Sequence, residues 1–125
     1  MTTTLEIAKK YVELCSTGQN HVALETLFSP DAVSIEAASM PGLPAEVRGL
    51  KAVIEKGKHW IENHEVHGAT VDGPWPNGER FIVRFGYDVT NKPSGRRMKM
   101  EEAALFTVDK GKIVREEFFY STEGG

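Results

Sequence analysis

The sequence predicts an α+β domain in which three N-terminal helices pack in a curved antiparallel sheet. Apolar residues recur at helical spacing in most of the first half of the chain, and afterwards they alternate with polar residues, as in strands. Clusters of residues that favour turns divide the alternating part into four segments. Helices followed by consecutive hairpins give the element order α-α-β-α-β-β-β-β.

The first helix is predicted to begin at Thr3, which forms a capping-box pattern with Glu6, and to end before Gly18. A second, shorter helix is predicted from a cap at Asn20 to the breaker at residues 29–31. A third helix is predicted from Leu50, with its Lys and Glu residues on the side away from the core. The apolar residues that define these helices are Leu5, Ala8, Tyr11, Val12 and Cys15, then Val22, Leu24, Leu27 and Phe28, then Leu50, Val53, Ile54, Gly57, Trp60 and Ile61.

The strands are predicted at residues 32–36, 65–72, 79–91, 97–109 and 112–121. Residues 37–48 contain two prolines and a glycine without a sustained period, which indicates a loop that could cover the mouth of a pocket. Trp75 lies between two prolines, and we expect it to anchor a loop.

The composition is that of one globular domain spanning residues 1–125, with 40% hydrophobic and 26% charged residues. No apolar run approaches the roughly 20 residues that cross a bilayer, and no basic leader precedes the first helix, so we expect a cytoplasmic protein without a membrane partner. The net charge of −3 gives nucleic-acid binding little electrostatic support. The single cysteine, Cys15, excludes an internal disulfide and is expected in the core.

One carboxylate interrupts an apolar strand face. Successive side chains of a strand point to opposite faces, so Glu102 should point into the protein with its row. A buried, unpaired carboxylate is costly unless it is neutralised, hydrogen-bonded or used in a cavity. If a bulge reverses its direction, Glu102 would instead pair with Arg84 or Arg97. Its row is Met98, Met100, Glu102, Ala104, Phe106 and Val108, and the core row of the preceding strand is Phe81, Val83, Phe85, Tyr87 and Val89.

The opposite sheet face is predicted to be partly apolar. Ile82 lies among charged residues, and the last strand has the mixed row Ile113, Arg115, Glu117 and Phe119. A contiguous apolar patch on a surface often marks an interface. We therefore expect a homodimer that forms through this outer face.

Several segments carry a resemblance to a known family. They are residues 11–14 (Tyr-Val-Glu-Leu), residues 27–32 (Leu-Phe-Ser-Pro-Asp-Ala), Arg48-Gly49, and residues 108–113 (Val-Asp-Lys-Gly-Lys-Ile). With these segments and its element order, nearly the whole chain resembles the nuclear transport factor two-like superfamily. It looks most like the SnoaL-like and ketosteroid-isomerase-like branches. The resemblance implies a cone-shaped fold with a hydrophobic pocket.

The resemblance also implies catalytic residues. Tyr11 matches a tyrosine of the first helix in ketosteroid isomerases, and Glu36 occupies the place of their catalytic aspartate after the Asp-Ala step. Their third polar group aligns with Ala104, and Glu102 lies one step away on the same strand face. The residues implied or expected to line the substrate pocket are Trp60, Phe85, Met100, Phe118 and Tyr120.

These residues suit proton transfer. Glu36 could remove a proton next to a carbonyl, while Tyr11 and a protonated Glu102 donate to the enolate oxygen. Two carboxyls in one apolar cavity do not ionise equally, because burial and repulsion raise at least one pKa. The same groups could protonate a leaving hydroxyl or orient water toward an epoxide, and the sequence does not choose. Glu116, in a row with Val114, Phe118 and Tyr120, is a further candidate acid.

The sequence therefore predicts a cofactor-independent acid/base enzyme of the isomerase, cyclase, dehydratase or epoxide-hydrolase type. Its expected ligand is a small apolar carbonyl, hydroxyl or epoxide compound in the cone. The alternative is a non-catalytic ligand-binding or dimeric association domain of the same fold. His59, His64 and His67 fit no metal-ligand signature, so we expect neither a metal nor another cofactor.

Overall fold

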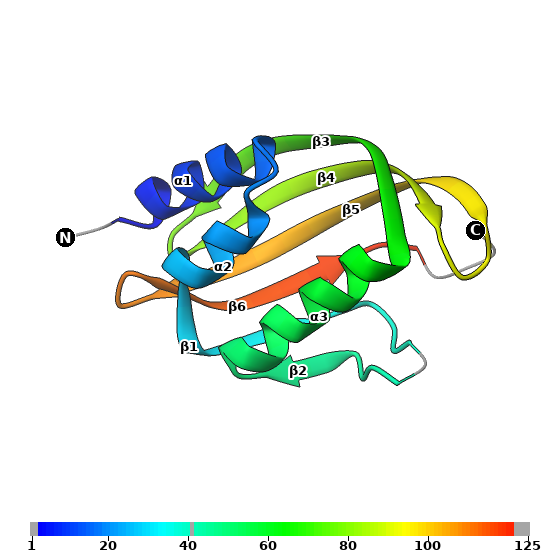
Figure 1. Cartoon of the computed structure of the whole chain (residues 1–125). Coiled ribbons are helices and arrows are strands. Elements are labelled where there is room, and N and C mark those ends of the chain that lie inside the picture. Colours follow the sequence, from blue (N-terminus) through cyan, green and yellow to red (C-terminus); the bar gives the residue numbers. More distant parts are fainter. Residues whose placement is uncertain (1–2, 41, 122–125) are drawn as a thin grey trace.

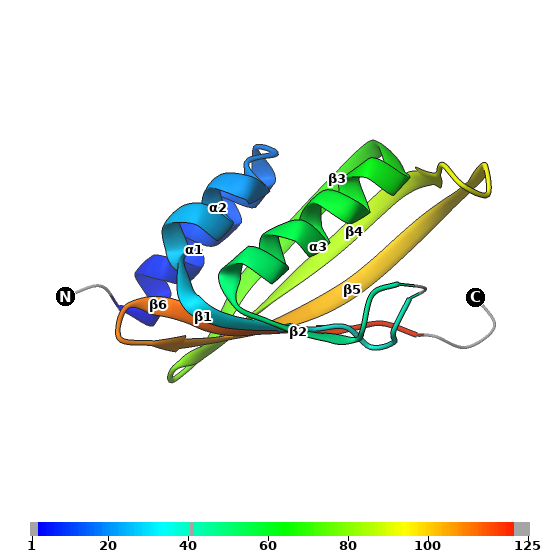
Figure 2. The same cartoon turned by 60° about the horizontal axis from the view of Figure 1, so that its bottom comes forward.

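The computed structural model describes residues 3–40 and 42–121 (Figure 1). The elements are α1 (Thr4–Ser16), α2 (Asn20–Leu27), β1 (Phe28–Ile35), β2 (Glu46–Arg48), α3 (Leu50–Asn63), β3 (His64–Asn77), β4 (Arg80–Asn91), β5 (Arg96–Asp109) and β6 (Lys112–Phe119). The helices lie on one side of a curved six-stranded sheet with the order β2-β1-β6-β5-β4-β3 (Figure 2). The predicted α+β fold is therefore confirmed.

The four C-terminal strands form the predicted antiparallel hairpins. β1 instead runs parallel to β6, and it pairs on its other side with β2, a strand inside the segment predicted to be a loop. β3 continues to Asn77, so Trp75 lies on a strand and is 54% exposed, and the prediction that it anchors a loop is wrong. β3 is an edge strand, where prolines are tolerated because one row of backbone groups needs no partner.

The helix ends follow local capping only in part. The predicted capping box is present at α1, where Thr3 Oγ1 accepts from the Glu6 N–H at 3.1 Å and Glu6 accepts from the Thr3 N–H. Asn20, predicted to be the cap of the second helix, is instead its first residue. Phe28, predicted on that helix, begins β1, where it pairs with Ile113 and is 3% exposed. Burial in the sheet outweighs helix propensity at this position.

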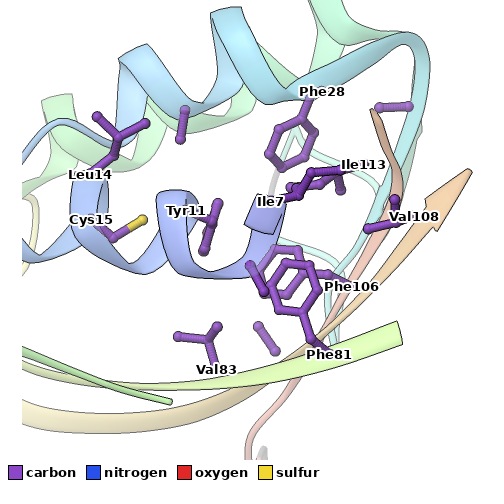
Figure 3. Packing of buried hydrophobic residues seen from close by; sticks show 14 of the residues in the cluster. Ile7, Tyr11, Leu14, Cys15, Phe28, Phe81, Val83, Phe106, Val108 and Ile113 are labelled. Atoms are coloured by element: carbon purple, nitrogen blue, oxygen red, sulfur yellow. The ribbon is translucent and has the colours of Figure 1, made fainter. Parts of the chain in front are cut away.

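The core fills the space between α1 and the inner face of the sheet (Figure 3). The Tyr11 ring lies 4.6 Å from the Phe106 ring and within 6.4 Å of three further phenylalanine rings. Cys15 is buried beside it, as expected. The inward rows predicted for β4 and β5 supply the sheet side of the core: Phe81, Val83, Phe85, Val89, Ala104, Phe106 and Val108 are buried.

A bulge in β6 changes which face its first residues occupy. Val108 pairs with Ile113 and Thr107 pairs with Arg115, so Val114 is an extra residue on β6. Ile113 is therefore fully buried in the core, and its prediction on the outer face is wrong. Beyond the bulge Phe119 is exposed and Glu116 is buried, which is the predicted alternation.

Within the described residues, no helix is long and apolar enough to cross a membrane.

Candidate functional site

A pocket of about 330 Å³ lies between the helices and the inner face of the sheet. Most of the predicted site residues line it, namely Tyr11, Glu36, Trp60, Phe85, Glu102 and Phe118. Among the described residues, Met100 and Tyr120 do not line it. Tyr87, which pairs with Met100 across β4 and β5, lines the wall instead. The pocket wall combines apolar side chains with four carboxyl groups and two lysines: Glu25, Glu36, Glu102, Glu116, Lys56 and Lys58.

Glu36, which directly follows β1, has a donor on each carboxylate oxygen. Lys56 Nζ on α3 forms an ion pair with Glu36 Oε2, and the side chains are only 11% and 13% exposed. The Tyr120 hydroxyl donates to Glu36 Oε1 at 3.0 Å. Burial and the Glu36 charge raise the pKa of Tyr120 to about 12, so this hydroxyl keeps its proton at neutral pH. The Glu36 carboxylate is fixed at the pocket wall by these two contacts.

Lys56 also connects Glu36 to a second carboxyl group. Its Nζ donates to Ser34 Oγ at 2.6 Å, and Ser34 Oγ donates to Glu116 Oε2 at 2.6 Å. Ser34 is fully buried and Glu116 is 5% exposed. Burial raises the pKa of Glu116 to about 7, although the Ser34 hydrogen bond and the Lys56 charge act in the opposite direction. A continuous polar chain thus runs through Glu116, Ser34, Lys56, Glu36 and Tyr120.

Glu102 lies on the same wall but outside this chain. It is opposite Phe85 on β4, and within residues 3–40 and 42–121 its carboxyl group has no hydrogen-bond or ion-pair partner. The arginine alternative does not apply, because Arg84 pairs with Glu101 and Arg97 pairs with Asp88. Burial raises the pKa of Glu102 to about 7, and the charges of Glu36 and Glu116 contribute in the same direction. Glu102 therefore titrates near neutral pH while facing an apolar space.

The Tyr11 hydroxyl has a partner in the core. It hydrogen-bonds with the Cys15 thiol, and burial raises the pKa of Tyr11 well above its usual value. Figure 3 shows Tyr11 and Cys15 on α1 among the buried side chains. Another tyrosine lies closer to Glu102: after burial, the Glu102 charge contributes most to the raised pKa of Tyr87. The structure thus brings Glu102 near Tyr87, whereas the Tyr11 hydroxyl bonds to Cys15.

Sequence reasoning missed Lys56 and Ser34. The lysines of the third helix were predicted on its outer side, but Lys56 follows Val53 by three positions and precedes Trp60 by four, a spacing that places it on the inner face. Ser34 alternates with Ala32 and Glu36 in the inward row of β1. For both residues, the spacing along the chain already indicated an inward-facing side chain. His21 lines the pocket, whereas His64 is stacked on Trp60 and His67 is hydrogen-bonded to Thr90. The described residues include no cluster of metal-ligating side chains.

Comparison with known proteins identifies the family. The sequence profile of the SnoaL-like domain matches residues 1–120. This chain belongs to the SnoaL-like domain family. A solved structure from Mesorhizobium loti, described both as a SnoaL-like polyketide cyclase and as a carbohydrate phosphatase, is 44% identical to this SnoaL-like chain with a TM-score of 0.90. That match covers 95% of this chain and 100% of the other.

More distant structures share the fold of this SnoaL-like domain. A nuclear transport factor two-like protein from Burkholderia thailandensis has a TM-score of 0.81 at 22% identity, covering 98% of this chain and 93% of its own. A protein from Bacillus subtilis assigned as an isomerase has a TM-score of 0.73 at 17% identity, with 94% and 86% covered. No curated protein matches the sequence. Proteins assigned as cyclases and isomerases thus share this small-pocket fold.

Proposed function

We propose that this SnoaL-like protein is a cofactor-independent general acid/base enzyme in which Glu102 exchanges a proton with the substrate. The substrate is a small, largely apolar molecule with a carbonyl, hydroxyl or epoxide group. One observation carries the proposal. The Glu102 carboxyl group lines the pocket with a pKa of about 7, and no described residue forms a hydrogen bond or ion pair with it. A general acid or base is most effective when its pKa lies near the working pH.

The proposal assigns the proton transfer to Glu102 rather than to Glu36. Both oxygens of Glu36 accept from Lys56 or Tyr120, and a proton taken up by Glu36 would weaken these contacts. Glu102 has no such contact to break within the described part of the chain. Glu36 therefore serves as the fixed negative partner of Lys56, and Glu102 is the exchangeable group.

The comparisons support a carbonyl compound as the substrate class. The Mesorhizobium loti protein is assigned as a polyketide cyclase, and polyketides carry carbonyl groups. The apolar part of the pocket wall suits the carbon skeleton of such a molecule. Its aromatic members are Trp60, Phe85, Tyr87 and Phe118.

Proton abstraction from 5-nitrobenzisoxazole tests this function without knowledge of the natural substrate. Removal of its single ring proton next to nitrogen opens the ring to a coloured phenolate. We expect the wild-type protein to accelerate this reaction and Glu102→Gln to lose about 100-fold or more of the rate. Glu101→Gln is the matched control, because Glu101 lies next to Glu102 on the opposite face and pairs with Arg84. Equal rates for the wild type and Glu102→Gln would contradict the proposal.

An association function is the second candidate, favoured by the outer face of the sheet. Trp75 is opposite Ile82 across β3 and β4, and the two side chains are 54% and 41% exposed. Phe119, 54% exposed, extends this apolar surface on β6. Such a surface supports a homodimer that could exist with or without catalysis.

A further inference from the structure

We propose that the Lys56 ammonium group binds the substrate oxygen that gains negative charge, which makes Lys56 a second catalytic residue beside Glu102. This inference rests on the proposed function. It assigns to α3 a donor role that the sequence analysis gave to Tyr11 and to a protonated Glu102.

The hydrogen-bond capacity of Lys56 is the first argument. An ammonium group has three N–H donors. Lys56 Nζ uses one toward Glu36 and one toward Ser34, and residues 3–40 and 42–121 offer it no third acceptor. Nζ lies 4.9 Å from the centroid of the Phe118 ring, and both residues line the pocket. The ammonium group, which also makes a cation–π contact with the Phe118 ring, therefore has one N–H without a hydrogen-bond acceptor, and a substrate oxygen in the pocket could accept from it.

The fixed position of Lys56 is the second argument. A donor stabilises a developing charge best when it is already oriented and shielded from water, since little reorganisation is then needed. Glu36 and Ser34 hold Nζ from two directions, and the Lys56 side chain is only 11% exposed. Lys58, which also lines the pocket, is 63% exposed and pairs with Glu55. Lys56 is therefore the lysine that is preorganised inside the pocket.

The third argument is that Lys56 and Glu102 face the same space. Both line the pocket, and the charge of Lys56 acts on Glu102. In the proposed step, the Glu102 carboxylate takes a proton from the carbon next to a carbonyl. The C–H electron pair forms a carbon–carbon double bond, and the carbonyl π electrons move to oxygen. The resulting enolate oxygen accepts from Lys56, and Glu102 then returns the proton to the same or another carbon.

Tyr87 is the competing donor on this wall. Its pKa is raised by burial and by Glu102, so its hydroxyl stays protonated and could donate to the same oxygen. The Tyr11 hydroxyl is a weaker competitor because it bonds to Cys15. The tests therefore compare Lys56 variants with Tyr87→Phe.

The first test measures the ionisation of bound 4-nitrophenol, a small aromatic probe whose phenolate absorbs visible light. In the wild type we expect Lys56 to favour the phenolate, so that the ionisation midpoint of the bound probe lies below that of the free probe. The variant Lys56→Met/Glu36→Gln removes both charges of the ion pair, so that no buried charge is left without its partner. We expect its midpoint to rise by about one pH unit or more, a tenfold change in the preference for phenolate. An unchanged midpoint would overturn the proposal.

The second test repeats the ring opening of 5-nitrobenzisoxazole, in which the oxygen leaves as a phenolate when the N–O bond breaks. We expect Lys56→Met/Glu36→Gln to lower kcat by about 100-fold. If Lys56 only holds Glu36 in place, the double variant keeps the wild-type rate, and the proposal is wrong. A large loss of kcat in Tyr87→Phe, with no loss in the double variant, would show that Tyr87 is the donor and would overturn the proposal.

Controls separate this inference from the proposed function. Lys51→Met removes an exposed lysine of the same helix outside the pocket and should leave the rate unchanged. If the double variant does not fold, Lys56→Gln/Glu36→Gln also removes both charges and keeps two polar side chains that can hydrogen-bond. Failure of the proposed function would appear as no wild-type turnover or as full turnover in Glu102→Gln. Turnover that needs Glu102 but not Lys56 would overturn only the role of Lys56.

Discussion

The Ser34 hydroxyl donates to Glu116 across 2.6 Å, between the parallel strands β1 and β6, where both side chains are buried. This single neutral donor does not offset the burial of Glu116, whose pKa rises from 4.5 to about 7. The folded state therefore holds this proton more tightly than the unfolded chain does. Proton binding at Glu116 is thereby linked to folding.

The first prediction is that stability falls as the pH rises through this window. Below about pH 4.5 both states keep the proton, whereas between pH 4.5 and about 7 only the folded state keeps it. Glu116 alone should lower the free energy of unfolding by about 3 kcal/mol across that window. Glu102, whose pKa is raised in the same direction, should add to the effect. Urea denaturation at about pH 5 and about pH 8 measures the difference.

A matched pair of variants assigns this pH effect. Glu116→Gln cannot ionise, so we expect its stability to differ less between the two pH values. Glu117→Gln, the neighbouring residue, which pairs with Arg115 on the outer face, should keep the wild-type dependence. A wild-type pH dependence in Glu116→Gln would show that Glu116 is not the linked group.

The second prediction concerns the start of α1. Thr3→Ala removes the side-chain oxygen that accepts from the Glu6 N–H, and we expect a loss of about 1 kcal/mol in the free energy of unfolding. Thr3→Ser retains a hydroxyl group and should remain within a few tenths of a kcal/mol of the wild type. Urea denaturation distinguishes the two variants. Equal stability of the alanine variant and the wild type would mean that the capping box contributes nothing.

The third prediction is a homodimer formed through the outer sheet face. Ile82 lies between Trp75 and Leu105 on the neighbouring strands, so a charge there would fall within the apolar surface. We expect light scattering at micromolar concentration to give a dimer for the wild type and a monomer for Ile82→Glu. Ile61→Glu introduces the same change at a 62% exposed site on α3 and should remain dimeric. A monomeric wild type would refute this prediction.

The arrangement of the sheet was predictable where a strand keeps a strict alternation. Ala104 and Phe106 follow Glu102 in one inward row, and this row alone placed the Glu102 carboxyl inside. The extra residue Val114 leaves no comparable signal, so the face of Ile113 was predicted wrongly. The parallel pairing of β1 with β6 joins segments far apart in the sequence, and no local pattern encodes it.

The candidate site was predictable in its carboxylates, and the helical spacing of Lys56 indicated the inner face, but the sequence did not indicate which residues pair with Lys56. A lysine on an amphipathic helix is usually solvated, and Lys56 is buried only because Ser34 on β1 and Glu36, directly after β1, provide its partners. That pairing depends on the packing of α3 against β1, which spacing along the chain does not specify. The same holds for Tyr11, whose helical position was correct but whose hydroxyl bonds to Cys15 one turn away.

The central claim is that Glu102 exchanges a proton near neutral pH, and an NMR titration of the glutamate side-chain carboxyl carbons tests it most directly. Comparison with Glu102→Gln assigns the Glu102 resonance. We expect a titration midpoint near pH 7 for Glu102, together with a change in its chemical shift when an apolar ketone enters the pocket. A midpoint near the ordinary value of 4.5, unchanged by ligand, would contradict it.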